Sequence, residues 1–148
     1  MLRDSNSGKI LLVEDNDDDV TLMKRAFKKS QMPNEMIIAR NGVAALDLLF
    51  GMNGKERVVP TFVILDLKLP KLNGLDVLRA IRANEFTKSM PVIVLTTSSE
   101  QEDIIHSYDL GANSYIRKPV EFDRFLEVIS SLNHYWITLN EHNPKYNG

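Results

Sequence analysis

The sequence contains no cysteine, and this absence excludes disulfides, thiolate nucleophiles and thiolate-bound zinc or iron–sulfur centres. Histidine is also scarce: His106, His134 and His142 are scattered and form no metal-ligand motif. No stretch approaches the ~18 apolar residues that a membrane span needs, and residues 1–8 are polar, unlike a secretion signal. We therefore expect a cytoplasmic protein with no membrane partner.

A basic excess is absent as well. Eighteen Lys and Arg residues stand against 20 Asp and Glu residues, so the net charge is -2 and offers nothing to hold a nucleic-acid backbone. With 43% hydrophobic and 26% charged residues, the composition is typical of a globular protein. A length of 148 residues fits one domain with a sizeable core. We expect no nucleic-acid partner.

Short apolar runs with β propensity alternate with stretches of helical periodicity. This alternation predicts an α/β fold, a doubly wound five-stranded parallel sheet with helices on both faces. The expected strands cover residues 10–13, 36–39, 62–67, 92–95 and 115–116, and the expected helices cover residues 17–30, 43–50, about 75–82, 100–110 and 121–140.

The last expected helix is unusually long. Twenty helical residues span ~30 Å, whereas a typical strand covers ~17 to 20 Å. Its final turns, which carry Trp136 and Leu139, should therefore overhang the sheet. We expect a domain at residues 8–130, a helical extension and tail at residues 131–148, and no output domain on this chain.

Polar side chains follow the ends of four expected strands. Glu14 and Asp15 follow the first strand, Asp66 lies at the end of the third, Thr96 ends the fourth, and Lys118 follows the fifth. In an open parallel sheet the ligand site lies beyond these carboxyl ends. Three converging carboxylates repel one another unless a cation joins them, and hard oxygen ligands suit Mg²⁺. The sequence therefore predicts a magnesium site at this edge.

The same residues allow phosphoryl transfer. The Asp66 carboxylate can act as a nucleophile and form an acyl phosphate if a divalent ion neutralises the incoming oxygens. The Thr96 hydroxyl and the Lys118 ammonium can then donate to these oxygens. Taken alone, Asp15 with Asp17, Asp18 and Asp19 is equally typical of a solvated helix start.

Two other functions use a similar arrangement of strands and helices. An aspartyl-phosphate phosphatase of the haloacid-dehalogenase type needs a second acid two residues after its nucleophile, but Lys68 stands there. A flavodoxin-like FMN carrier needs a loop rich in hydroxyls and glycine after the first strand, whereas the acids from Glu14 onward would repel a phosphate. A pseudo-receiver that works without phosphate is a further alternative.

Four strings in order carry a family resemblance: ILLVEDNDDD, VILDLKLPKLNG, VIVLTTS and GANSYIRKP. Over about residues 8–130 the chain resembles a response-regulator receiver domain of two-component signalling, and the resemblance implies the flavodoxin-like strand order 2-1-3-4-5. The resemblance implies a phosphoacceptor signalling protein rather than an enzyme. The residues it assigns are Asp66 as phosphoacceptor, Glu14 and Asp15 with Asp66 and the Lys68 backbone carbonyl as Mg²⁺ ligands, Thr96 and Lys118 as phosphate contacts, Thr96 and Tyr115 as switch residues, and a cis peptide between Lys118 and Pro119.

Three departures from the family pattern stand out. The acidic pair is Glu14-Asp15 instead of Asp-Asp, and Asn73-Gly74 replaces the usual Asp-Gly. Lys68 and Ser98 occupy the positions that flank the attacking water. We expect these two residues to set the lifetime of the acyl phosphate.

The resemblance also implies partners. The phosphoryl donor would be a phosphohistidine on a sensor histidine kinase, and the signal would pass to a downstream protein or a phosphotransfer protein. The connector at residues 51–60 and the long terminal helix are similar to small stand-alone regulators that partner phytochrome-like kinases. The apolar stripe beyond the sheet favours a homodimer through the face formed by the fourth expected helix (residues 100–110), the fifth strand (115–116) and the fifth helix (121–140), together with the extension.

Overall fold

The structure is a computed structural model, and it describes residues 8–30, 34–98, 100–118 and 121–133. Strands and helices alternate along these residues, as the sequence predicts. Their bounds are β1 (Lys9–Val13), α2 (Asp17–Lys29), β2 (Glu35–Ala39), α3 (Gly42–Phe50), β3 (Phe62–Leu65), α4 (Gly74–Ala83), β4 (Val92–Thr96), α5 (Gln101–Asp109), β5 (Ser114–Arg117) and α6 (Phe122–Asn133).

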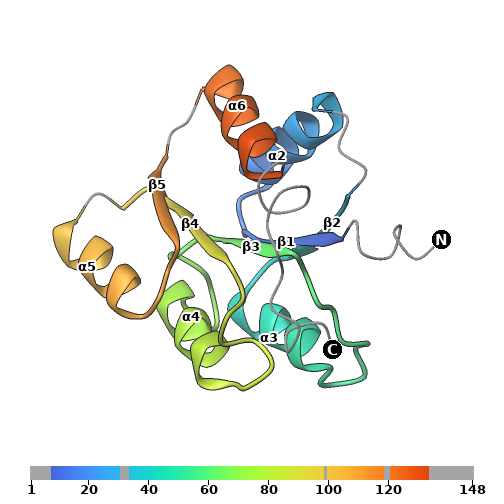
Figure 1. The fold of residues 1–148 in the computed structure, drawn as a ribbon, viewed down its shortest axis with the longest axis vertical. Helices are drawn as coiled ribbons and strands as arrows, with labels where there is room; N and C mark the ends of the chain where they lie inside the picture. Colours follow the sequence, from blue (N-terminus) through green and yellow to red (C-terminus); the bar gives the residue numbers. More distant parts are fainter. Residues whose placement is uncertain (1–7, 31–33, 99, 119–120, 134–148) are drawn as a thin grey trace.

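The strands form one parallel sheet in the order β2-β1-β3-β4-β5. Helices α2 and α6 lie side by side on one face, and α3, α4 and α5 lie on the other (Figure 1). The predicted fold class and strand order are confirmed. The order reverses between β1 and β3, so a ligand site is expected where the carboxyl ends of these two strands meet.

Alternating side chains of the strands divide the core into two layers. Leu11, Val63 and Val94 pack towards α3 and α4, whereas Leu12, Ile64 and Ile93 pack towards α2 and α6. All six side chains are at most 2% exposed. Each buried aliphatic side chain contributes about 1.5 to 3 kcal/mol of transfer free energy, so the centre of the sheet is a firm base for the loops at its edge.

Three helices begin with an asparagine cap. The side chains of Asn16, Asn41 and Asn73 accept hydrogen bonds from backbone N–H groups three residues later, at 2.8 to 3.0 Å. Such a cap stabilises a helix by about 1 kcal/mol. Helix α5 has no side-chain cap, and Ser107 is its one buried residue. Of the four helices from α2 to α5, α5 is therefore the least firmly anchored.

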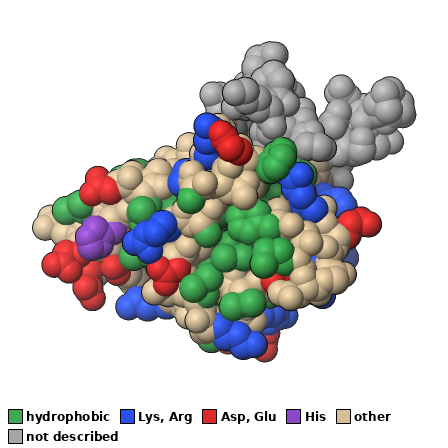
Figure 2. All heavy atoms as spheres, turned by 90° about the horizontal axis from the view of Figure 1, so that it is seen from below, with side chains coloured by type: hydrophobic (Ala, Val, Ile, Leu, Met, Phe, Trp, Pro, Cys, Tyr) green, Lys and Arg blue, Asp and Glu red, His purple; other side chains and the backbone are tan. Residues whose placement is uncertain are grey.

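The layer of α3 and α4 is incompletely covered. Helix α3 is apolar around most of its circumference, and the Val43 side chain is 42% exposed. Seen from this side, hydrophobic side chains gather in the middle of the face (Figure 2). A surface helix normally places charged residues on its outer side, as α2 does. The outer side of α3 is less polar than that of α2.

The final turns of the long predicted helix, with Trp136 and Leu139, lie outside the described residues. Within the described ranges, no helix is long and apolar enough to span a membrane.

Candidate functional site

The acidic pair lies where β1 ends. The backbone N–H of Glu14 donates to the carbonyl of Ala39 on β2, which prolongs the strand ladder by one residue. The Glu14 side chain points inward and is 1% exposed, whereas Asp15 is exposed. The Oε2 atom of Glu14 accepts a hydrogen bond from the backbone N–H of Asn16 at 3.2 Å. One buried and one exposed carboxylate thus follow the strand.

Asp66 comes directly after β3. The sequence predicted a strand that continues to Leu67, and this bound is wrong because the Leu67 carbonyl accepts from Gly74 in the following turn instead of pairing with a strand. A Cβ atom on Gly74 would lie 2.3 Å from the Asp66 carbonyl oxygen, so this close turn needs glycine. Asp66 itself is 6% exposed, and its Oδ1 accepts from the Lys68 N–H at 3.2 Å.

The three carboxylates among the four predicted metal ligands lie together. One carboxylate oxygen from each of Glu14, Asp15 and Asp66 falls within 4.8 Å of the others. All three donors are hard carboxylate oxygens, and the exposed Asp15 leaves an open side on which water can complete the coordination. This donor set fits a hard divalent cation such as Mg²⁺ or Mn²⁺ better than zinc.

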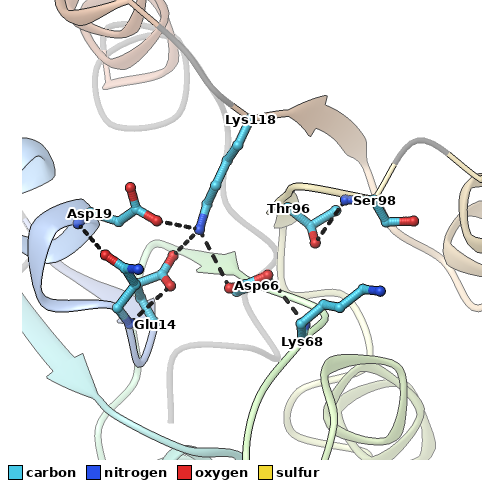
Figure 3. A network of polar contacts seen from close by, with 8 residues as sticks. Glu14, Asp19, Asp66, Lys68, Thr96, Ser98 and Lys118 are labelled. Atoms are coloured by element: carbon cyan, nitrogen blue, oxygen red, sulfur yellow. Dashed lines mark hydrogen bonds and ion pairs between the residues drawn. The ribbon is translucent and has the colours of Figure 1, made fainter.

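Lys118 crosses from the end of β5 to this cluster, and its side chain is 9% exposed. Its Nζ donates to Glu14 Oε1 and Asp19 Oδ2 at 2.7 Å each, and to Asp66 Oδ2 at 3.4 Å. The ammonium therefore lies between Glu14 and Asp19 on one side and Asp66 on the other (Figure 3). Three donors of one ammonium are shared among three carboxylates.

The electrostatics of the cluster follow from burial. Burial raises the pKa of Glu14 to about 7, although the hydrogen bond from Lys118 opposes this shift. Burial also acts to lower the pKa of Lys118, but its hydrogen bonds to Asp19 and Glu14 outweigh this effect and the pKa is raised. Lys118 therefore stays charged. The single ammonium does not fully offset the burial of the Glu14 carboxylate, and a bound divalent cation would add positive charge beside it.

Hydroxyl groups line the other side of the site. Thr96 is fully buried at the end of β4, unlike the exposed Thr97, and its Oγ1 accepts from the Ser98 N–H at 3.5 Å. The Ser98 hydroxyl donates to Asp103 on α5 at 2.5 Å. The phenol of half-buried Tyr115 donates to the Ser98 carbonyl at 3.0 Å. The loop after β4 is thus held to both α5 and β5.

The sequence-based interpretation missed two residues. Asp19 was grouped with a solvated helix start, yet it binds Lys118. Asp17 and Asp18 share its place in the first turn of α2, so no residue pattern distinguishes Asp19. Asp103 was missed because nothing in the sequence signals its contact with Ser98. His106 is exposed, as expected for a surface residue. The predicted cis peptide involves Pro119, outside the described residues.

Comparisons with known proteins agree with this geometry. The model of the response regulator receiver domain family matches residues 10–130. The chain is 39% identical over 131 residues to the probable methanogenesis regulatory protein FilR2 of Methanothrix harundinacea, covering 88% of this chain and 84% of FilR2. It is 37% identical over 139 residues to the response regulator Rcp1 of Synechocystis sp., covering 93% of this chain and 95% of Rcp1.

Two solved structures carry relevant ligands or modifications. The phosphorylated cyanobacterial phytochrome response regulator RcpA superposes with a TM-score of 0.80 at 35% identity, over 90% of this chain and 96% of RcpA. The Mn²⁺-bound form of Rcp1 superposes with a TM-score of 0.79 at 34% identity, over 92% of this chain and 99% of Rcp1. Motifs, fold, acidic cluster and relatives agree, and the chain belongs to the response regulator receiver domain family of two-component signalling.

Proposed function

We propose that this receiver domain accepts a phosphoryl group from a sensor histidine kinase on Asp66 and signals by changing its contacts with partner proteins. The observation that carries the proposal is that Asp66 lies beside the acidic pair Glu14-Asp15 and 3.4 Å from the Lys118 ammonium at the edge of the sheet. Phosphorylated RcpA, a relative of the same fold, supports it.

We assign Mg²⁺ as the cofactor, held by Glu14, Asp15, Asp66 and the backbone carbonyl of Lys68. Mn²⁺-bound Rcp1, a relative of the same fold, supports binding of a divalent ion, and Mg²⁺ favours the same oxygen donors. When bound, the ion would neutralise charge on the phosphoryl oxygens. Because the acidic pair is Glu14-Asp15 instead of Asp-Asp, we expect the contact of Glu14 with the ion to pass through a water molecule.

The transfer step uses few residues of this chain. An Asp66 carboxylate oxygen attacks phosphorus, the O–P bond forms, and the P–N bond to the donor imidazole breaks with its electron pair going to nitrogen. Lys118 and Thr96 donate to the transferred oxygens. Lys68, which is exposed, and Ser98, which is buried, flank the path of the water that later hydrolyses the acyl phosphate.

The response begins at Thr96. Movement of its hydroxyl towards the phosphoryl group would loosen its contact with the Ser98 N–H and change the space available to Tyr115. This shift biases the surface of β4, α5 and β5 between two populated states. Helix α5 buries only one residue, which supports such a role, because a weakly anchored helix can shift at a small cost in free energy.

Partners follow from the relatives and from exposed surface. A phytochrome-type kinase is proposed because RcpA is a phytochrome response regulator. We propose that residues 8–130 form the receiver unit and that residues 131–148, a helical extension and tail, contribute to homodimer formation. The dimer face would include α5, where the side chains of Ile105 and Tyr108 are 55% and 50% exposed. No nucleic-acid contact is proposed.

Phosphoramidate provides the test. Intact mass is followed after incubation of the protein with phosphoramidate and Mg²⁺, and again with EDTA in place of Mg²⁺. We expect the wild type to gain one phosphoryl group only with Mg²⁺, and Asp66→Asn to gain none. Asp76→Asn, which removes an acid of α4 away from the cluster, should behave as wild type. Equal labelling of wild type and Asp66→Asn would contradict the proposal.

A further inference from the structure

Asp19 is a charged residue of the site that has no role in the family resemblance or in the function proposed above. It lies in the first turn of α2, and its Oδ2 accepts from Lys118 Nζ at 2.7 Å. The same Nζ lies 3.4 Å from Asp66, the proposed phosphoacceptor. In this state the ammonium is therefore held more closely by Asp19 and Glu14 than by Asp66.

Donation to a phosphoryl oxygen would require the ammonium to weaken one of its two short contacts. The two partners differ in burial: the Glu14 side chain is 1% exposed, whereas the Asp19 side chain is 30% exposed. A buried carboxylate that loses its partner bears the full cost of desolvation, but a partly exposed one returns to water. The contact with Asp19 is thus the one that Lys118 can exchange at lower cost.

We propose that Asp19 is a positioning residue that holds Lys118 in the unphosphorylated protein and is exchanged for a phosphoryl oxygen when Asp66 is phosphorylated. The proposal rests on the proposed function of Asp66. It implies that Asp19 competes with the phosphoryl group for the ammonium and slows phosphorylation.

The exchange predicts different effects on the two rate constants. The Lys118–Asp19 contact is present before transfer and weakened in its transition state, so its removal should speed phosphorylation. In the phosphorylated protein the contact is already lost, both before hydrolysis and in the transition state for hydrolysis. Removal of Asp19 should therefore leave the hydrolysis rate constant unchanged. A general loss of structure would not produce this separation.

The test compares Asp19→Asn with Asp18→Asn. Asp18 is an exposed acid of the same turn, so its variant removes the same charge and the same helix-dipole contact. With phosphoramidate and saturating Mg²⁺, we expect Asp19→Asn to be phosphorylated about three- to tenfold faster than Asp18→Asn. The first-order hydrolysis constants of the two phosphorylated variants, measured after donor removal, should agree within about 1.5-fold.

Equilibrium binding of beryllofluoride, a phosphoryl mimic, tests the same exchange without turnover. By ¹⁹F NMR at saturating Mg²⁺, its dissociation constant should be lower for Asp19→Asn than for Asp18→Asn by about the same three- to tenfold factor. Slower phosphorylation of Asp19→Asn, rates equal to the control, or parallel changes in both rate constants would each overturn the proposal. If the wild type itself is not phosphorylated, the proposed function fails, which is a distinguishable result.

Discussion

The two sides of the site are held together by different forces. One side is the acidic half (Glu14, Asp15, Asp19, Asp66 and Lys118), in which the nearly buried Lys118 ammonium makes charged contacts with Glu14, Asp19 and Asp66. On the other, the hydroxyl half (Thr96, Ser98, Asp103 and Tyr115) is joined mainly by hydrogen bonds to one loop and to α5. Strong charges and a firm core suit the chemistry of transfer, whereas a weakly anchored helix suits a response.

The difference extends to the supporting elements. Asp66 follows β3, whose four residues are all buried, and α2 next to the acidic half buries four side chains and has an asparagine cap. Helix α5 next to the hydroxyl half buries one residue and has no side-chain cap. Variants of the acidic half should therefore alter rates and metal affinity, whereas variants of Asp103 and Tyr115 in the hydroxyl half should alter the order of α5 and its loop.

The largest effect is expected for Lys118→Met. Loss of the ammonium removes a donor to the transferred oxygens, and removal of one such donor costs on the order of 100-fold in rate. The phosphorylation rate constant with phosphoramidate, followed by intact mass, should fall by that factor. Lys24→Met, which removes an exposed lysine of α2, is the control. A fall of less than threefold for Lys118→Met would contradict the assigned role.

Glu14→Gln should raise the free energy of unfolding and lower the affinity for Mg²⁺. Burial makes the ionised Glu14 costly, as its raised pKa indicates, so a neutral side chain of the same size should raise the free energy of unfolding by about 1 to 2 kcal/mol at pH 8 in EDTA. Mg²⁺ affinity should fall about tenfold. Urea denaturation and Mg²⁺ titration measure the two effects.

Asp15→Asn provides the matched comparison for that pair of measurements. Asp15 is exposed, so its variant should weaken Mg²⁺ binding and leave the free energy of unfolding within about 0.5 kcal/mol of wild type. If Glu14→Gln and Asp15→Asn changed stability alike, burial would not explain the raised pKa of Glu14.

In the hydroxyl half, Asp103→Ala should loosen α5. The variant removes the acceptor of the Ser98 hydroxyl, and the loss of a charged hydrogen bond costs about 1 kcal/mol. Amide hydrogen exchange at residues 101–109 should become several-fold faster, while phosphorylation of Asp66 changes less than twofold. Glu102→Ala, an exposed acid of the same turn, controls for the helix dipole. A large fall in phosphorylation would break the separation of the two halves.

Tyr115→Phe should give the smallest effect, about 0.5 to 1 kcal/mol of unfolding free energy at neutral pH. Burial raises the pKa of the Tyr115 phenol above its ordinary value of 10.0, although its bond to Ser98 opposes the shift. The folded protein therefore keeps this proton to higher pH than the unfolded chain. The stabilisation is complete below pH 10 and is lost as pH rises through the folded pKa. The difference in phenolate absorbance between wild type and variant, followed with pH, checks that Tyr115 loses its proton at a higher pH in the folded protein than in the unfolded chain.

Sequence patterns predicted the sheet well because its strands are short apolar runs separated by clear helix caps. Leu67 was wrongly placed in a strand, since its apolar side chain is compatible with both a strand and the buried turn against Gly74. Glu14, Asp15 and Asp66 were predicted to meet because parallel strands end at one edge, and they do.

The contacts of Asp19 and Asp103 were not predictable in the same way. Asp19 is one of several acids in the first turn of α2, and only the three-dimensional position of Lys118 distinguishes it from Asp18. The contact of Asp103 with Ser98 depends on how α5 follows its loop, a detail of geometry rather than of residue pattern.

The most direct test of the central claim locates the acyl phosphate. The protein phosphorylated with phosphoramidate and Mg²⁺ is reduced with borohydride, which converts a phosphorylated aspartate into homoserine, and is then digested and sequenced by mass spectrometry. The account predicts homoserine at position 66 alone. Reduction at Asp15, Asp19 or another carboxylate, with aspartate intact at position 66, would contradict it.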